Sequence, residues 1–297
     1  MDRVIYKVRE DFNCSIKEFL KNNHIGRGKI EEIRMKKLAY VNGKNVSIDS
    51  YINKNDVLEF RIEEEVDFAP EFIDLDIVYE DDYLLIVNKP AGIIIHPDNK
   101  DEIGTLVNRV ASYYICNNIN RNIRYLHRID RDTTGLVMFA KDFLTEGIMI
   151  NKIENNEVDR YYLALACGKF KDLKGEIVAS IGKDRHVNGK MCIGNGDKAK
   201  YAKTGYEVLG SNKDNTISLV KFKLYTGRTH QIRVHSSYIK HPLVGDVMYG
   251  YRGSEKVDRV CLNCNELRFN HPITNEEIIV KIDMPIEYNA FILINNT

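Results

Sequence analysis

The feature that most constrains this chain is a dense polar cluster that runs directly into an apolar segment, over residues 127–141. Residues 136–140 form an uninterrupted apolar run, which is typical of a buried strand. The residues before them include three alternating charged side chains, at Arg128, Asp130 and Asp132. A polar loop attached to a core strand is a rigid support for binding or catalysis. We therefore expect a functional site where this strand begins.

The length and composition of the chain limit the class of protein. A chain of 297 residues with 43% hydrophobic residues is long enough for one large and one small domain. The six cysteines follow no signal-like segment, which predicts reduced thiols and a cytoplasmic location. No apolar run approaches the ~18 residues of a membrane span, so we expect no membrane association. The composition therefore favours a globular cytoplasmic protein.

The charge is unevenly distributed although its sum is zero. Residues 17–44 contain eight Lys or Arg against three Glu, whereas residues 66–82 contain seven acidic residues and no basic one. Residues 1–65 are interpreted as a small domain, residues 66–76 as an acidic linker containing Pro70, and residues 77–297 as the main domain.

The small N-terminal part carries helix and hairpin signals. Ser15 begins a short helical segment, residues 28–37 predict a second helix, and Asn42-Gly43 is a strong hairpin turn before a strand at 56–62. This order resembles the alpha-L RNA-binding module known from a small-subunit ribosomal protein. Such a charge run is also common on an ordinary solvated helix face. The resemblance implies that these cations contact RNA phosphates: Arg27, Lys29, Arg34, Lys36 and Lys37.

The pattern in the main domain mixes strands and helices. Basic, Gly-rich residues 183–205 predict a loop or hairpin. A helix from an N-cap at Thr229 to Lys240 is expected after the last of the central strands. The remaining expected strands are 83–87, 93–95, 136–140, 160–166, 220–224 and a pair within 259–286, and the remaining helices are 104–117 and 144–153.

The polar cluster reads HRIDRDTTGLVMFAK and resembles the signature of the RluA-type RNA pseudouridine synthases, HRLD-x-x-TSGLLLxAK. A second block, TGRTHQIRVH at 226–235 followed by HPLVGD at 241–246, matches the family independently. Looser matches are the NKPAG turn at 88–92, the RYYLA strand at 160–164 and residues 259–286. The resemblance implies an α+β fold: a mixed, mainly antiparallel sheet flanked by helices, with a small N-terminal α/β RNA-binding domain.

The resemblance also implies a reaction. Uracil is detached from its ribose, rotated and rejoined through carbon, so we expect neither a cofactor nor a metal. Asp130 is the implied nucleophile, which either attacks the anomeric carbon or abstracts a ribose proton. Arg228 is its implied ionic partner, Tyr162 stacks on the base, and Arg128 fills the gap left by the flipped nucleotide. His127, Thr133 and Arg233 are further expected substrate contacts.

The expected partner is RNA, and the layout is similar to synthases of large-subunit ribosomal RNA, with transfer RNA as the alternative. We expect a monomer without a nucleotide cofactor, because the chain has neither G-x-G-x-x-G nor a Walker sequence.

Two other functions use the same residues. The first is a non-catalytic RNA-binding or ribosome-assembly protein, and the second is a metal-dependent RNA hydrolase using Asp130 and Asp132. A zinc site at Cys261 and Cys264 is disfavoured, because residues three apart in a strand point to opposite faces. A serine hydrolase is disfavoured because there is no G-x-S-x-G sequence.

Overall fold

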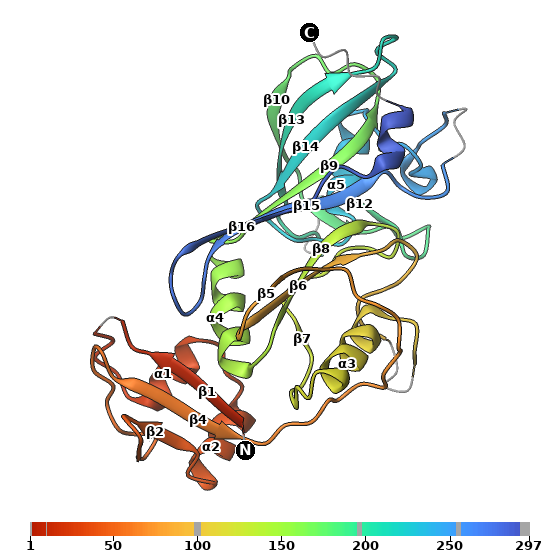
Figure 1. The fold of residues 1–297 in the computed structure, drawn as a ribbon. Coiled ribbons are helices and arrows are strands. Elements are labelled where there is room, and N and C mark those ends of the chain that lie inside the picture. The colour runs from red at the N-terminus through yellow and green to blue at the C-terminus, as the bar shows by residue number, and fades with distance from the viewer. Residues whose placement is uncertain (1, 10, 98–101, 195–197, 254–256, 292–297) are drawn as a thin grey trace.

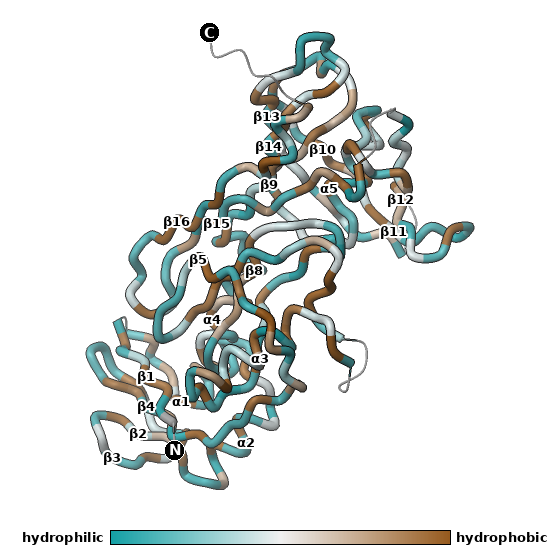
Figure 2. The backbone as a smooth tube through the Cα atoms, turned by 45° about the vertical axis from the view of Figure 1, so that its right-hand side comes forward, coloured by the Kyte–Doolittle hydropathy of each residue, from teal (hydrophilic) through white to brown (hydrophobic). Residues whose placement is uncertain are grey.

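The computed structural model describes residues 2–9, 11–97, 102–194, 198–253 and 257–291. Two sheets organise it, a small one near the N-terminus and a long one that runs through the rest of the molecule (Figure 1). Hydrophilic segments predominate in the loops that project from the ends of the long sheet (Figure 2). Within the described ranges, no helix is long and apolar enough to cross a membrane.

The N-terminal sheet is antiparallel, with the order β1 (Asp2–Lys7), β4 (Val57–Ile62), β2 (Ala39–Val41) and β3 (Lys44–Asn45). The predicted hairpin turn is confirmed, since Asn42 and Gly43 both have positive φ, 50° and 77°. Strand β1 was not expected from the sequence, because its partner β4 lies about fifty residues further along the chain.

Two helices cover this sheet. Helix α1 (Ile16–Asn22) begins with a capping box, in which Ser15 and Glu18 satisfy each other's backbone amides. Helix α2 (Arg27–Met35) ends two residues before the predicted end, because Lys37 adopts a left-handed φ of 52°.

The N-terminal core continues into helix α4 (Phe143–Glu154), which belongs to the main body (Figure 1). Phe143, Leu144 and Ile148 lie in the same hydrophobic cluster as the two N-terminal helices. The backbones meet at Gly147, where an added Cβ would lie 2.0 Å from the Asn23 carbonyl oxygen. The N-terminal module is therefore seated directly on the main body. Its division from the rest at residue 65 stays a prediction.

The long sheet has ten strands and is mainly antiparallel, as the predicted α+β class requires. Among the described strands, only β15 and β8 pair in parallel. The order is β10 (Lys174–Val178), β13 (Lys203–Ser211), β14 (Ile217–Leu224), β9 (Asp159–Cys167), β15 (Leu262–Asn270), β8 (Thr134–Ala140), β6 (Leu84–Lys89) and β5 (Ile77–Glu80). Strands β16 (Glu277–Lys281) and β7 (Arg124–Tyr125) pair with β15 and β8.

Helices α3 (Leu106–Cys116) and α4 lie over this sheet as predicted, and residues 183–205 include part of a hairpin of β11 (Ile181–Lys183) and β12 (Met191–Ile193). Two short 3-10 helices, Val247–Tyr249 and Ile286–Ala290, complete the described elements.

The predicted strand at 93–95 is wrong. The carbonyls of Ile94 and Ile95 accept hydrogen bonds from the amides of Leu106 and Val107, at the start of α3. This apolar run is a packed loop, whose hydrogen bonds go to a helix end instead of a neighbouring strand.

The expected N-cap at Thr229 is also wrong. Helix α5 (Gln231–Tyr238) has His230 at its N-cap, with a φ of 55°, and no side chain caps it. Instead, the Gln231 side chain accepts a hydrogen bond from the Arg228 amide at 3.0 Å. The helix begins later than predicted and also ends two residues earlier than Lys240.

Candidate active site

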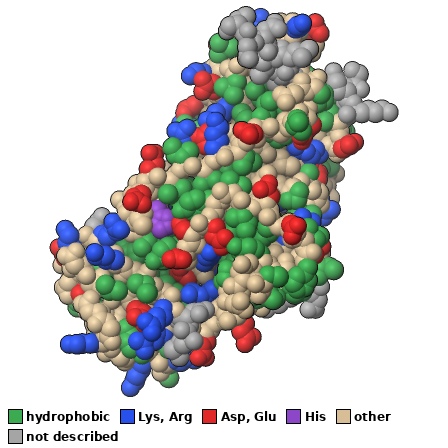
Figure 3. Space-filling view, in the orientation of Figure 1, with side chains coloured by type: hydrophobic (Ala, Val, Ile, Leu, Met, Phe, Trp, Pro, Cys, Tyr) green, Lys and Arg blue, Asp and Glu red, His purple; other side chains and the backbone are tan. Residues whose placement is uncertain are grey.

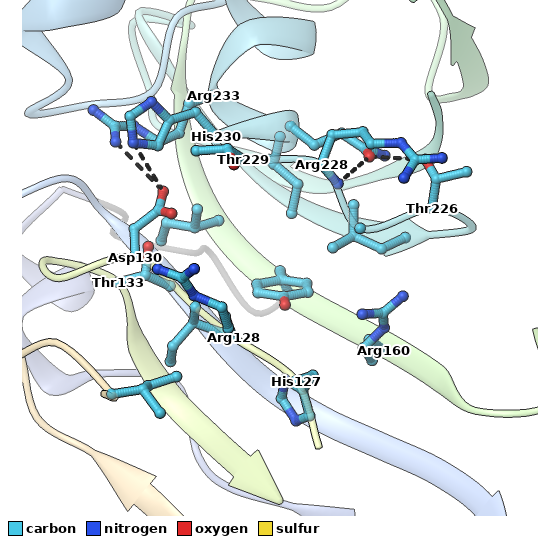
Figure 4. A pocket seen from close by; sticks show the side chains of 18 of the residues that line it. His127, Arg128, Asp130, Thr133, Arg160, Thr226, Arg228, Thr229, His230 and Arg233 are labelled. Atoms are coloured by element: carbon cyan, nitrogen blue, oxygen red, sulfur yellow. Dashed lines mark hydrogen bonds and ion pairs between the residues drawn. The ribbon is translucent and has the colours of Figure 1, made fainter. Parts of the chain in front are cut away.

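A cavity of about 670 Å³ opens between the loop before β8, strand β9, the end of β14 and the start of α5. This volume is in the usual range for a small-molecule site and would hold a nucleotide. Polar residues from both strong sequence blocks line it, including Asp130 and Arg233 (Figure 4). The fold thus brings together two segments that are about a hundred residues apart.

The loop that carries Asp130 is fixed through its backbone. The Thr133 amide donates to the Asp130 carbonyl at 3.2 Å, and the Gly92 amide donates to the Arg131 carbonyl at 3.0 Å. Lys89 is fully buried, and its Nζ donates to the Arg131 carbonyl at 2.8 Å and to two carbonyls of its own turn. Burial lowers the pKa of Lys89 to about 8. The NKPAG turn is thereby a support for the polar loop.

Gly135 lets β8 approach β15 closely. Its φ is 109°, and an added Cβ would lie 2.2 Å from the carbonyl oxygen of Cys264. Beside it, Asn263 donates to the Thr134 hydroxyl at 2.8 Å. These contacts hold the end of the polar loop in register with the central sheet.

Asp130 faces two groups of helix α5. Its Oδ2 lies 3.4 Å from Nη1 of Arg233 and 3.9 Å from Nε2 of His230 (Figure 4). Arg233 is itself held by Asp246, which accepts from its Nε at 2.8 Å and from its Nη2 at 2.9 Å. Burial alone would lower the pKa of Arg233, but the hydrogen bonds and charge of Asp246 and the charge of Asp130 raise it. A permanent cation is thus aimed at the Asp130 carboxylate.

The expectation that Arg228 pairs with Asp130 is wrong. Nε of Arg228 donates to the Tyr201 carbonyl at 3.0 Å, and the side chain lies away from Asp130 across the cavity (Figure 4). Arg228 precedes α5, whereas Arg233 lies within the helix on the side that faces the polar loop. Arg228 still lines the cavity.

His230 is a site residue to which the sequence analysis assigned no role. Its Nδ1 lies 2.8 Å from the Tyr249 hydroxyl, and burial lowers its pKa, although the Asp130 charge opposes this. Its spacing of three from Arg233 predicts a shared helical face and could have identified it. Asp246 is the last residue of the HPLVGD block and was noticed only as part of that motif, and Tyr249 lies three residues beyond it.

Three predicted residues that line the cavity are buried. Tyr162 is buried at 4% exposure, and burial raises its pKa well above the usual range. His127 accepts a hydrogen bond from the Met138 amide at Nε2, so the proton of the neutral ring is assigned to Nδ1. Burial, aided by the charge of Arg160, lowers the pKa of His127 to about 3. Both His127 Nδ1 and the Thr133 hydroxyl are buried and have no hydrogen-bond partner among the described residues.

Arg128 and Asp132 differ in their relation to the cavity. Arg128 is exposed and projects along the cavity below Asp130 (Figure 4). Asp132 is exposed and does not line the cavity. The geometry therefore favours Asp130 over Asp132 as the reactive carboxylate.

The basic residues of the N-terminal module are partly neutralised. Lys29 pairs with Glu32 and Glu64, and the other two ion pairs are Arg34 with Glu31 and Lys36 with Glu32. For Arg27 and Lys37, no ion pair occurs among the described residues. Figure 3 shows Lys and Arg side chains gathered at the module's end of the molecule, with acidic side chains between them.

The described residues hold no group of three His, Cys, Asp or Glu side chains suited to a metal. Cys261 and Cys264 are both buried, but they lie in different hydrophobic clusters. This is the opposite-face arrangement expected for residues three apart in a strand.

Comparison with known proteins agrees with this geometry. A family model described as RNA pseudouridylate synthase matches residues 83–238. The uncharacterized RNA pseudouridine synthase YhcT of Bacillus subtilis is 38% identical over 249 residues, covering 83% of this chain and 82% of that protein. The ribosomal large subunit pseudouridine synthase D of Escherichia coli is 32% identical, covering 94% and 85%.

Solved structures give the same result. Human RNA pseudouridylate synthase domain containing 1 superposes with a TM-score of 0.58 at 29% identity, covering 71% of this chain and 83% of that chain. The cavity lined by both strong sequence blocks, the matching family model and the similar relatives lead to one conclusion. The chain belongs to the RNA pseudouridylate synthase family and is an RNA pseudouridine synthase.

Proposed function

We propose that the protein isomerises uridines of large-subunit ribosomal RNA, with Asp130 as the catalytic carboxylate acting on a flipped-out nucleotide. The relative from Escherichia coli whose name states a large-subunit activity supports the choice of RNA. The observation that carries the catalytic assignment is the Asp130–Arg233–Asp246 array at the wall of the cavity.

This array suits a carboxylate that must react while desolvated. Water is displaced from the cavity when a nucleotide enters, and the fixed guanidinium of Arg233 then stabilises the ionised form of Asp130. The carboxylate either bonds to the anomeric carbon as uracil departs, or removes a ribose proton. Both routes return Asp130 to its starting state when uracil is rejoined through carbon.

The other cavity residues have complementary roles. The base stacks on Tyr162, which lines the cavity. His127 Nδ1 and the Thr133 hydroxyl, both without partners, hydrogen-bond to polar groups of the nucleotide. The exposed Arg128 enters the RNA stack in place of the flipped base, because a guanidinium stacks on bases and binds phosphate.

The test is a pseudouridine map of unmodified ribosomal RNA after incubation with wild type and with Asp130→Asn, in buffer containing EDTA. New pseudouridines in large-subunit RNA with the wild type alone are the expected result. Modification of transfer RNA alone would replace the proposed substrate, and full activity of Asp130→Asn would reject the catalytic assignment. Chain cleavage that occurs in a parallel reaction without EDTA and is absent with EDTA would instead indicate a metal-dependent hydrolase.

A non-catalytic RNA-binding protein makes a different prediction. It would bind RNA equally well with and without Asp130, and neither naked RNA nor ribosomal particles would gain pseudouridine. The same map made on both substrates therefore separates this function from catalysis.

A further inference from the structure

One cation that lines the cavity, Arg160, has no ionic partner among the described residues. Arg160 lies near the start of β9 and is only 8% exposed. Within the part of the chain that the structure describes, its guanidinium makes no ion pair, and its Nε is buried without a hydrogen bond. A buried charge without a counterion is costly, so such a group is retained where a ligand supplies the opposite charge.

The position of Arg160 relates it to the base platform. Arg160 and Tyr162 are two residues apart in β9, so they face the same side of the sheet, roughly 6.6 Å apart along the strand. Both line the cavity. Gly227 follows the end of β14, and the Arg160 guanidinium lies against it: a Cβ added at Gly227 would be 3.2 Å from Nη1 of Arg160. The absence of a side chain at Gly227 leaves this cation open to the cavity.

The charges around Arg160 favour an anion. Five arginines line the cavity (residues 128, 131, 160, 228 and 233), against the two carboxylates of Asp130 and Glu154. Asp130 faces Arg233, and the largely exposed Glu154 lies 3.5 Å from His24. Arg160 and Arg228 both lie on the side of the cavity away from Asp130 (Figure 4).

We propose that Arg160 binds the phosphodiester next to the target nucleotide while the base lies on Tyr162. The inference rests on the proposed function, and it adds a phosphate contact made inside the cavity. A phosphodiester carries a permanent charge, whereas uracil is charged only during the reaction. The planar guanidinium can hold two phosphate oxygens at once, which a lysine cannot.

The test uses binding without turnover. Asp130→Asn and Asp130→Asn/Arg160→Met are titrated with the unmodified ribosomal RNA transcript that the wild type modifies, over a series of potassium chloride concentrations. We expect roughly 10- to 100-fold weaker binding from loss of a charge-assisted contact. The slope of log Kd against log salt should fall by about 0.7 to 0.9, the value of one phosphate contact. Arg160→Lys should keep most of the slope and lose less affinity.

A matched control removes one arginine elsewhere. Arg268 lies beside Tyr161, on the sheet face opposite to Tyr162, and pairs with Glu266. Arg268→Met should change neither the affinity nor the slope by a comparable amount. Equal effects of both variants would mean that Arg160 affects binding only through the net charge of the protein, and would overturn the inference.

Two further measurements keep the outcome unambiguous. In the active enzyme, which keeps Asp130, Arg160→Met should raise KM more than it lowers kcat. An unchanged salt slope together with a fall confined to kcat would mean that Arg160 contacts the base, and would reject the phosphate contact. The melting temperature of the free variant should be unchanged or higher, since an uncompensated charge is removed. A wild type that makes no pseudouridine would refute the proposed function instead, independently of the binding result.

Discussion

At the scale of single residues, the site depends on side chains that never need to touch the substrate. Asp246 is almost fully buried and binds one edge of the Arg233 guanidinium with both carboxylate oxygens, so it fixes the direction in which that cation points. Arg233 then presents Nη1 to Asp130 at 3.4 Å. Asp246 therefore positions Arg233 toward Asp130, although it lies in a sequence block distant from Asp130.

Replacing this carboxylate should reduce the reaction rate more than the affinity for RNA. In Asp246→Asn the shape is kept, but Arg233 loses a bidentate anion and is free to turn away from Asp130. We expect the single-turnover rate at saturating enzyme to fall roughly 10- to 100-fold, as for a lost charge-assisted hydrogen bond. Arg233→Lys should behave similarly, because an ammonium cannot contact both carboxylates with the same geometry. A normal rate in both variants would contradict the positioning role.

His127 should make the stability of the protein depend on pH. Its folded-state pKa is about 3 and the ordinary value is 6.5, so between these values the unfolded chain binds a proton that the folded protein does not. Stability contributed by the neutral ring is present above pH 6.5 and is lost as the pH falls, by about 1.4 kcal/mol per pH unit.

His127→Leu removes this titration, so its free energy of unfolding should fall less steeply than that of the wild type between pH 6 and pH 4. Urea denaturation at both pH values measures the difference in slope. Parallel pH profiles of the two proteins would show that His127 is charged in the folded state.

At the scale of the elements, the polar loop is held from both ends. The NKPAG turn holds the Arg131 carbonyl through Lys89 and Gly92, and the parallel contact between β8 and β15 holds the other end. The chemistry therefore lies on backbone that is fixed by the central sheet.

Gly135 is the point at which this arrangement is most sensitive. In Gly135→Ala the new Cβ meets backbone atoms of Cys264 at 2.2 to 2.7 Å, at a φ that L-residues avoid. We expect a loss of about 3 kcal/mol or more in the free energy of unfolding, measured by chemical denaturation. Gly210→Ala is the control, because nothing lies within 4 Å of its added Cβ. Equal stability of the two variants would mean that β8 can move away from β15.

The elements predicted correctly are those whose signal is local. Strands such as 160–166 and 220–224 and helices such as 104–117 follow from apolar spacing, and Asn42-Gly43 forms the expected turn. The run at 93–95 has the same apolar pattern, but its hydrogen bonds go to α3. Strand β1 and the partnership of Asp130 with Arg233 depend on contacts between distant segments, which spacing in one sequence does not encode.

At the scale of the whole molecule, the N-terminal module and the main body share a core and an ion-pair network. Glu64 lies 3.4 Å from Lys29 of α2 and 2.6 Å from Arg124, and Arg124 lies 3.2 Å from Glu146 of α4. Asn151 of α4 also donates to the Asn22 carbonyl at 3.0 Å. The module is thus attached by apolar, ionic and backbone contacts.

Gly147→Ala should weaken this attachment. The added Cβ would lie 2.0 Å from the Asn23 carbonyl oxygen, and that backbone cannot move without leaving α4. We expect faster hydrogen exchange in α1 and a larger radius of gyration by small-angle scattering. Gly28→Ala is the control, because no atom lies within 4 Å of the added Cβ, and it should leave the hydrogen exchange and the radius of gyration unchanged. A Gly147→Ala protein that is as compact as the wild type would show that the contact adjusts without separation.

The seating of the module on α4 has a consequence for substrate choice. The basic residues of the module and the cavity are held at one fixed separation. We therefore expect an RNA to be modified when its fold places a backbone segment and a uridine at that spacing. Such selection would read the tertiary structure of the RNA and not most of the intervening nucleotide sequence, so unfolding the RNA should abolish modification even though every base remains present.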